Sequence, residues 1–105
     1  MKVFLVKKEF AVNLSTTTFC LHEGDIAYSK NDSKGVPYFY MVEYNCKNFD
    51  GKESRHKFNI PLNLNESVWI HKIFKRKKIK DILSEGYIED ITAQYNREAI
   101  LKMLL

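Results

Sequence analysis

The clearest structural signal in the chain is the stretch YFYMVEY, residues Tyr38 to Tyr44. Its even-numbered and odd-numbered positions point to opposite sides of an extended backbone, and nearly all of its residue types favour that backbone. Tyrosine or valine occupies one side, whereas Phe39, Met41 and Glu43 occupy the other. The stretch therefore predicts a β-strand that carries large side chains on both faces.

Shorter strand signals lie on both sides of this stretch. Residues 2–12 alternate well enough for a strand, residues 15–22 are rich in threonine, and residues 26–28 form a short apolar run. Residues 57–62 place Phe58, Ile60 and Leu62 on one face. Pro61 predicts an edge strand, because proline cannot donate a ladder hydrogen bond. The first 64 residues are therefore predicted to be mainly β-structure.

Turn-forming residues separate these runs. Glu23-Gly24-Asp25 indicates a tight turn, and the polar residues 29–37 (SKNDSKGVP) indicate a loop. Asp50-Gly51 is typical of a hairpin turn, because glycine readily adopts the positive φ that such turns need. Each strand signal is thus followed by a turn signal, which favours antiparallel neighbours.

The spacing of apolar residues changes after about Asn65. Six of them fall at helical spacing: Trp69, Ile73, Phe74, Ile79, Ile82 and Leu83. Gly86 is a plausible end of such a helix. Residues 68–74 also fit a last strand before a shorter helix over residues 77–85, and both interpretations remain open at this point.

The end of the chain has a helical pattern as well. Ile88, Ile91 and Tyr95 recur at helical spacing, and residues 97–105 predict a final helix that begins after Asn96. This helix is expected to turn three apolar side chains inward, namely Ile100, Leu101 and Leu104.

Strands followed by helices predict an α+β fold in one domain over residues 1–105, with 1–64 mainly β and 65–105 mainly α. The expected architecture is a small antiparallel sheet or an open barrel of about five strands, followed by two or three C-terminal helices. The short strands, the Gly-Asp turn and the polar loop are similar in pattern to SH3-like small barrels.

Several properties indicate an intracellular, cytoplasmic protein. The first residues, MKVFLVKK, contain an apolar run of only four residues between lysines, which does not fit a secretory signal. No apolar stretch approaches the roughly 20 residues that span a membrane, so no membrane partner is expected. Cys20 and Cys46 are expected to be buried free thiols rather than a disulfide.

Sites for chemistry are weakly indicated. Cys20, His22, Cys46 and His56 have the right atoms for zinc, but they lack the paired spacing of zinc sites. His22 lies beside Glu23 and Asp25 at a turn, where acids commonly bond the local backbone. No nucleophile elbow, phosphate-binding glycine loop or zinc-protease motif occurs. We therefore expect a protein that is not an enzyme, with no metal, no cofactor and no small-molecule substrate.

The positive charge is concentrated in one segment. Six cations and no acid lie between Trp69 and Lys80: Lys72, Lys75, Arg76, Lys77, Lys78 and Lys80. The whole chain carries +4, so the other 93 residues together carry about −2. Such a segment is either the solvated flank of a helix or a surface that binds phosphates and releases their counterions.

Aromatic side chains provide a second kind of contact. Tyr28, Tyr38 and Tyr40 are candidates for stacking single-stranded bases, although tyrosines on a sheet more often fill the core. The sequence therefore favours a small interaction protein that binds another protein, for example an accessory or inhibitor protein of a phage or mobile element. The alternative is a nucleic-acid-binding module that uses residues 72–80 against phosphates.

Overall fold

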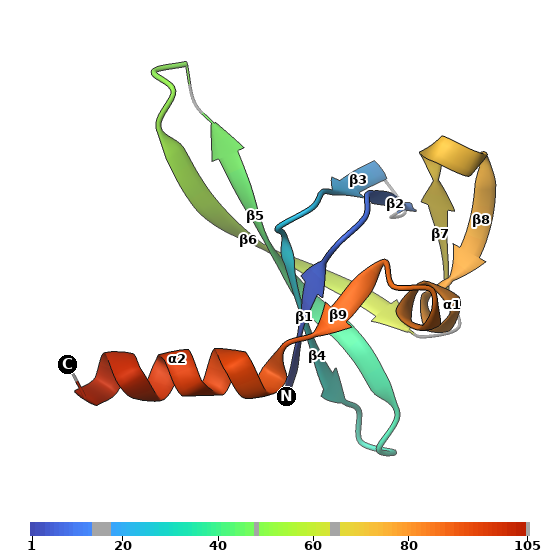
Figure 1. The fold of residues 1–105 in the computed structure, drawn as a ribbon. Helices are drawn as coiled ribbons and strands as arrows, with labels where there is room; N and C mark the ends of the chain where they lie inside the picture. Colours follow the sequence, from blue (N-terminus) through green and yellow to red (C-terminus); the bar gives the residue numbers. More distant parts are fainter. Residues whose placement is uncertain (14–17, 48, 64–65, 105) are drawn as a thin grey trace.

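The computed structural model describes residues 1–13, 18–47, 49–63 and 66–104. In these ranges the chain forms two antiparallel sheets and two α-helices (Figure 1). The strands are β1 (Lys2–Val6), β2 (Phe10–Asn13), β3 (Thr18–Leu21), β4 (Ile26–Asn31), β5 (Pro37–Lys47), β6 (Glu53–Asn63), β7 (Ser67–Ile70), β8 (Lys75–Lys78) and β9 (Ile88–Asp90). The helices are α1 (Ile79–Ser84) and α2 (Thr92–Leu104), with a single 3₁₀ turn, η1 (His71–Ile73).

The larger sheet has the strand order β6-β5-β4-β1-β9. The predicted strand over Tyr38 to Tyr44 is confirmed as the middle of β5, which pairs with β4 on one side and with β6 on the other. Pro61 lies on β6 at the edge of this sheet, as predicted. The predicted turns at Gly24 and Gly51 are confirmed, with φ values of 95° and 76°.

The smaller sheet has the order β3-β2-β7-β8. Residues 2–12 therefore do not form one strand, because β1 belongs to the larger sheet and β2 to the smaller one. The backbone N–H of Lys7, between the two strands, donates to the carbonyl of Tyr87 at 2.7 Å. This link holds the chain where it crosses from one sheet to the other.

The core is formed by the faces that the two sheets turn towards each other. The larger sheet contributes Phe4, Val6, Ala27, Phe39, Val42, Ile60, Leu62 and Ile88. The smaller sheet contributes Phe10, Val12, Leu21, Val68 and Ile70, and α1 adds Ile79 and Ile82. Burial of apolar surface is the main favourable term in folding, so this layer stabilises both sheets at once.

The expected architecture, one small sheet or SH3-like open barrel of about five strands followed by two or three helices, is wrong. The described residues form two antiparallel sheets of five and four strands, and three of these strands follow residue 65. Residues 67–70 and 75–78 form a β-hairpin. The strand alternative for residues 68–74 is therefore correct only for residues 68–70, because residues 71–73 form a 3₁₀ turn and the helix begins at Ile79 rather than at Lys77. Val68 and Ile70 are buried while Trp69 between them is partly exposed, which is strand alternation. The helical spacing of Trp69, Ile73 and Phe74 does not correspond to a buried face, because Ile73 and Phe74 are exposed at the hairpin turn.

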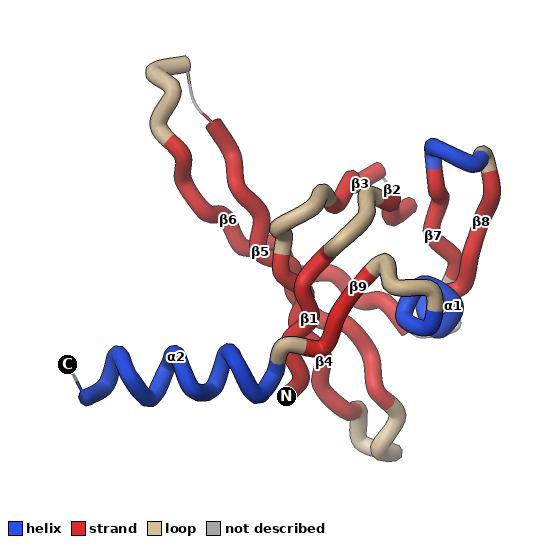
Figure 2. Tube along the Cα trace, viewed as in Figure 1, coloured by secondary structure: helices blue, strands red, loops and turns tan. Residues whose placement is uncertain are grey.

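The C-terminal part also differs from expectation. Ile88 belongs to strand β9, which pairs with β1, and α2 begins at Thr92 rather than after Asn96. Only the beginning of α2 lies against the sheet, where the ring of Tyr95 meets that of Tyr28. Ile100 and Leu101 were expected to face inward, but they are 56% and 58% exposed. Figure 2 shows α2 extending away from both sheets.

Two smaller expectations concern the thiols and the membrane. Cys20 and Cys46 are free, but Cys46 is exposed and Cys20 is only partly buried, so the expectation of two buried thiols is wrong. None of the described helices has the length and the apolar character that crossing a membrane requires.

Candidate functional site

The β7–β8 hairpin carries most of the basic segment. Its strands pair in a simple register, with Ser67 opposite Lys78, Val68 opposite Lys77, Trp69 opposite Arg76 and Ile70 opposite Lys75. Residues that lie opposite each other in an antiparallel pair point to the same face. The hairpin therefore has an inner face with Val68 and Ile70 and an outer face with Trp69 and Arg76.

The outer face continues across the smaller sheet. Trp69 lies opposite Ala11 of β2, and Ala11 lies opposite Cys20 of β3. Ala11 is buried, yet it does not belong to the core between the sheets. Cys20, Ala11, Trp69 and Arg76 thus lie side by side across the smaller sheet. Because the side chain of Ala11 is small, the largest side chains among these four are those of Trp69, which is partly exposed, and Arg76, which is exposed.

Aromatic rings gather at the tip of the hairpin. The centroids of the Trp69 and Phe74 rings are 6.5 Å apart, and those of Trp69 and His71 are 6.3 Å apart. The indole N–H of Trp69 donates to Nδ1 of His71 at 3.1 Å, which fixes the plane of the indole. Phe74 closes the 3₁₀ turn with φ 51° and ψ 45°, and its side chain is 79% exposed.

The structure distributes the six predicted cations over three elements. Lys72 lies in η1, four cations lie on β8, and Lys80 lies in α1. Lys77 points to the inner face, where its Nζ is 2.8 Å from the carboxylate of Glu85. The hydrogen bond with Glu85 raises the pKa of the Lys77 amine, which keeps it charged and engaged.

The other five cations are exposed: Lys72, Lys75, Arg76, Lys78 and Lys80. Among the ion pairs formed within the described ranges, none involves any of these five. An exposed and unpaired cation keeps its full charge available to an external anion. Arg76 and Lys78 lie on the outer face with Trp69, whereas Lys75 lies on the inner face, opposite Ile70 and next to the tip of the hairpin. We call the five exposed cations of the hairpin and the start of α1 the hairpin surface.

The predicted tyrosines lie elsewhere. Tyr28 is 4% exposed, so its ring cannot stack a base at the surface. Tyr38 and Tyr40 are partly exposed on β5, where the amine of Lys30 lies 4.6 Å from the centroid of the Tyr40 ring. All three belong to the larger sheet, so the fold does not bring them together with the hairpin surface.

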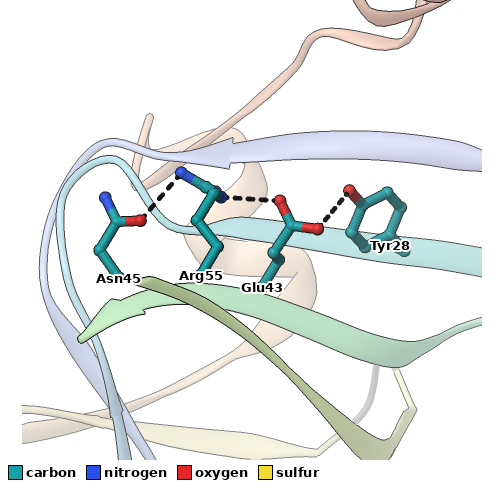
Figure 3. A network of polar contacts seen from close by, with 4 residues as sticks. All are labelled: Tyr28, Glu43, Asn45 and Arg55. Atoms are coloured by element: carbon teal, nitrogen blue, oxygen red, sulfur yellow. Dashed lines mark hydrogen bonds and ion pairs between the residues drawn. The ribbon is translucent and has the colours of Figure 1, made fainter. Parts of the chain in front are cut away.

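Tyr28 ends a chain of polar contacts on the outer face of the larger sheet (Figure 3). Its hydroxyl donates to one carboxylate oxygen of Glu43 at 3.4 Å, and Nε of Arg55 donates to the other at 2.8 Å. Nη1 of Arg55 also donates to the side-chain oxygen of Asn45 at 3.1 Å. The contacts link three neighbouring strands, β4, β5 and β6. The polar groups of these side chains therefore already have hydrogen-bond partners within the sheet.

The turn that carries His22 and Asp25 has a structural role. A carboxylate oxygen of Asp25 accepts a hydrogen bond from the backbone N–H of His22 at 2.9 Å. Nε2 of His22 lies 3.8 Å from the carboxylate of Glu9 on the exposed surface. Within the described part of the chain, no three histidine, cysteine or acidic side chains come together as metal ligands would.

A cleft of about 580 Å³ lies at the far end of the larger sheet. Phe4, Phe39 and Leu83 provide its apolar lining, and Lys2 and Thr92 are among its polar residues. The hydroxyl oxygen of Thr92 accepts a hydrogen bond from the backbone N–H of Val3 at 2.9 Å. This hydrogen bond holds the beginning of β1 in place. The cleft lies apart from the hairpin surface and shares no residue with it.

Trp69, His71 and Phe74 are the residues that sequence reasoning did not assign to the site. The sequence left helix and strand open for residues 68–74, and the alternation of Val68, Trp69 and Ile70 is the signal that favours the strand. Comparisons of the chain with protein families, with curated proteins and with solved structures found no match. A function can therefore be inferred only from the geometry of the hairpin surface and its rings.

Proposed function

We propose that this chain is a nucleic-acid-binding protein that holds phosphates with the hairpin surface. The observation that carries the proposal is a set of five exposed cations on one projecting hairpin and the helix after it, none of which forms an ion pair with another described residue. Cations that neutralise phosphates release condensed counterions, and this release supplies most of the affinity of sequence-independent binding. The sequence favoured a protein partner, whereas the shape of the hairpin favours nucleic acid.

The arrangement of the charges suits a phosphate backbone. Arg76 and Lys78 are two residues apart on β8, so they point to the same outer face. Lys72 extends the charge to the tip of the hairpin, and Lys80 extends it into α1. An extended row of cations on a narrow ribbon can follow a backbone that carries one charge per nucleotide.

Direct binding measurements test this function. We expect the purified protein to bind short DNA or RNA in about 50 mM salt and to lose affinity steeply as the salt concentration rises. The double variant Arg76→Gln, Lys78→Gln should bind more weakly than the wild type. The matched control is Lys34→Gln, Lys57→Gln, which removes two exposed lysines from the β4–β5 loop and from β6. Failure to bind at low salt, or an equal loss in both double variants, contradicts the proposal.

A second candidate function is the binding of another protein through α2. The support for it is the exposed distal half of this helix, where Ile100, Leu101 and Met103 are 56%, 58% and 86% exposed. A projecting helix with exposed apolar side chains suits an apolar groove on a partner. The sequence-based expectation of a phage or mobile-element accessory protein belongs to this alternative.

Helix α2 offers a matched pair of variants for this second function. Leu101→Lys, Met103→Lys should abolish capture of a partner from host lysate, whereas Gln94→Lys, Asn96→Lys on the same helix should preserve it. Both variants must keep the wild-type thermal unfolding midpoint. Capture of the same proteins by both variants contradicts this function, and so does a homodimer that only Leu101→Lys, Met103→Lys disrupts.

Either function is proposed for a cytoplasmic protein that is not an enzyme and uses no cofactor or small-molecule substrate. The turn at His22 supports this view, because its Asp25 carboxylate bonds the backbone instead of a second catalytic group. Turnover of a substrate that is lost in His22→Ala would contradict it.

A further inference from the structure

We infer that the nucleic acid on the hairpin surface is single-stranded and that its bases stack on Trp69 and Phe74. This inference rests on the proposed function, since it names the class of nucleic acid that the same hairpin accepts. It adds a contact with bases to the contacts with phosphates, and the two kinds of contact can be removed separately.

The first observation is the unusual backbone conformation of Phe74. A phenylalanine with φ 51° adopts the left-handed conformation that glycine or asparagine usually occupies. Its side chain gains little from burial in return, because 79% of it is exposed. Backbone strain of this kind clusters at binding sites, where it serves to present a side chain. Here the strained residue presents an aromatic ring at the tip of a basic hairpin.

The second observation is the environment of Trp69. Arg76 lies opposite Trp69 on the neighbouring strand and on the same outer face, and the ring of Phe74 lies close to that of Trp69 at the tip. The hydrogen bond to His71 holds the indole in place before any ligand arrives. A fixed indole next to a guanidinium is the combination on which single-stranded bases stack, with the cation facing the backbone.

The rings also discriminate between single and double strands. A base can stack on a protein ring only when its own face is free, and in a duplex the neighbouring base pairs cover both faces. Lysine, the main cation of the hairpin surface, acts as a point charge and reads no base edge. We therefore expect a preference for unpaired strands with little dependence on base sequence.

Trp69 is the only tryptophan of the chain, so its fluorescence reports on this site alone. The probe is an oligothymidylate of about 12 nucleotides, within the site sizes of known single-strand binders. Two comparison ligands are an abasic strand with the same number of phosphates and a duplex of about 12 base pairs, whose affinity is compared per phosphate. We expect oligothymidylate to quench Trp69 and to bind about 5- to 150-fold more tightly than the abasic strand, the range that one stacked base accounts for.

Variants at Phe74 complete the test. Phe74→Ala should remove most of the preference for oligothymidylate over the abasic strand, while Phe74→Tyr should keep it. The matched control is Phe49→Ala, which removes a fully exposed ring (109%) from the tip of the β5–β6 hairpin. We expect this control to bind like the wild type. Far-ultraviolet circular dichroism verifies that all three variants are folded.

The outcomes separate the two proposals. No binding of any of the three ligands at low salt overturns the proposed function itself. Equal affinity for oligothymidylate and the abasic strand, or an unchanged Trp69 emission on binding, overturns base stacking and leaves phosphate binding standing. Tighter binding of the duplex overturns the preference for single strands.

Discussion

Trp69 on β7 lies directly opposite Arg76 on β8, so that the indole and the guanidinium share the outer face of one hairpin. On the other face of the same two strands, Val68 is buried and Lys77 is engaged by Glu85. The hairpin is therefore two-sided: one side packs into the protein except at its tip, where Lys75 is exposed, and the other presents the ring of Trp69 with Arg76 and Lys78 to solvent.

Lys77 and Lys78 are neighbours in sequence, but they are expected to contribute differently to binding. Lys78→Gln should lower the magnitude of the slope of log K against log salt by about 0.7 to 0.9, the value for one phosphate contact. Lys77→Gln should change the slope less, because its cation already pairs with Glu85 at 2.8 Å. Equal effects of the two substitutions would show that binding does not depend on which face of β8 a lysine occupies.

The left-handed backbone at Phe74 makes a prediction about stability. Phe74→Gly should be more stable than Phe74→Ala by about 1 kcal/mol, because glycine alone accepts φ 51° without a steric penalty. Both variants lose the same ring contact with Trp69, so the difference isolates the backbone. Urea unfolding measures it. A more stable alanine variant would be inconsistent with the strained turn.

Helix α2 and the core should respond very differently to truncation. Ile82→Ala should lower the free energy of unfolding by about 2 to 5 kcal/mol, since Ile82 of α1 is fully buried in the core that both sheets share. Ile100→Ala should change it by no more than about 0.5 kcal/mol, as expected for an exposed position. Urea unfolding of both variants gives the comparison. A large loss in Ile100→Ala would mean that α2 packs against the body of the protein.

Tyr28 predicts a dependence of stability on alkaline pH. Burial, with contributions from Tyr95 and Glu43, raises the pKa of the Tyr28 hydroxyl well above its usual value. The folded state thus binds this proton more tightly than the unfolded state. The protonated Tyr28 hydroxyl therefore contributes fully to the free energy of unfolding below a pH of about 10, the usual tyrosine pKa. This contribution is lost as the pH rises beyond that value. Stability above this pH should fall more steeply in the wild type than in Tyr28→Phe, and parallel curves would contradict the assignment.

Local sequence patterns predicted the elements whose signal is short-range. The strand over Tyr38 to Tyr44, the turns at Gly24 and Gly51 and the edge position of Pro61 all follow from residue types within a few positions. The predicted fold class is wrong where a helical spacing and a strand alternation of apolar residues overlap, as in residues 68–74. There Trp69 and Phe74 suggested a helix, although the buried Val68 and Ile70 belong to a strand.

The candidate site divides in the same way. The sequence located the cluster of cations, because charge is visible residue by residue. It missed the rings of Trp69, His71 and Phe74, because whether an aromatic side chain is buried or exposed depends on the partner strand. It also proposed Tyr28, whose exposed fraction is only 4% beneath its neighbours on the larger sheet.

Local residue patterns alone predicted short strands, a helical end and one concentrated segment of positive charge. These properties depend on residue type and on spacing over a few positions. The folded arrangement was needed to show that residues 2–12 divide between two sheets, that β7 and β8 form a hairpin and that α2 projects. The reason is that strand pairing and burial depend on residues far apart in sequence, such as Ala11 opposite Trp69. This long-range pairing also leaves Trp69 and Arg76 on an open face.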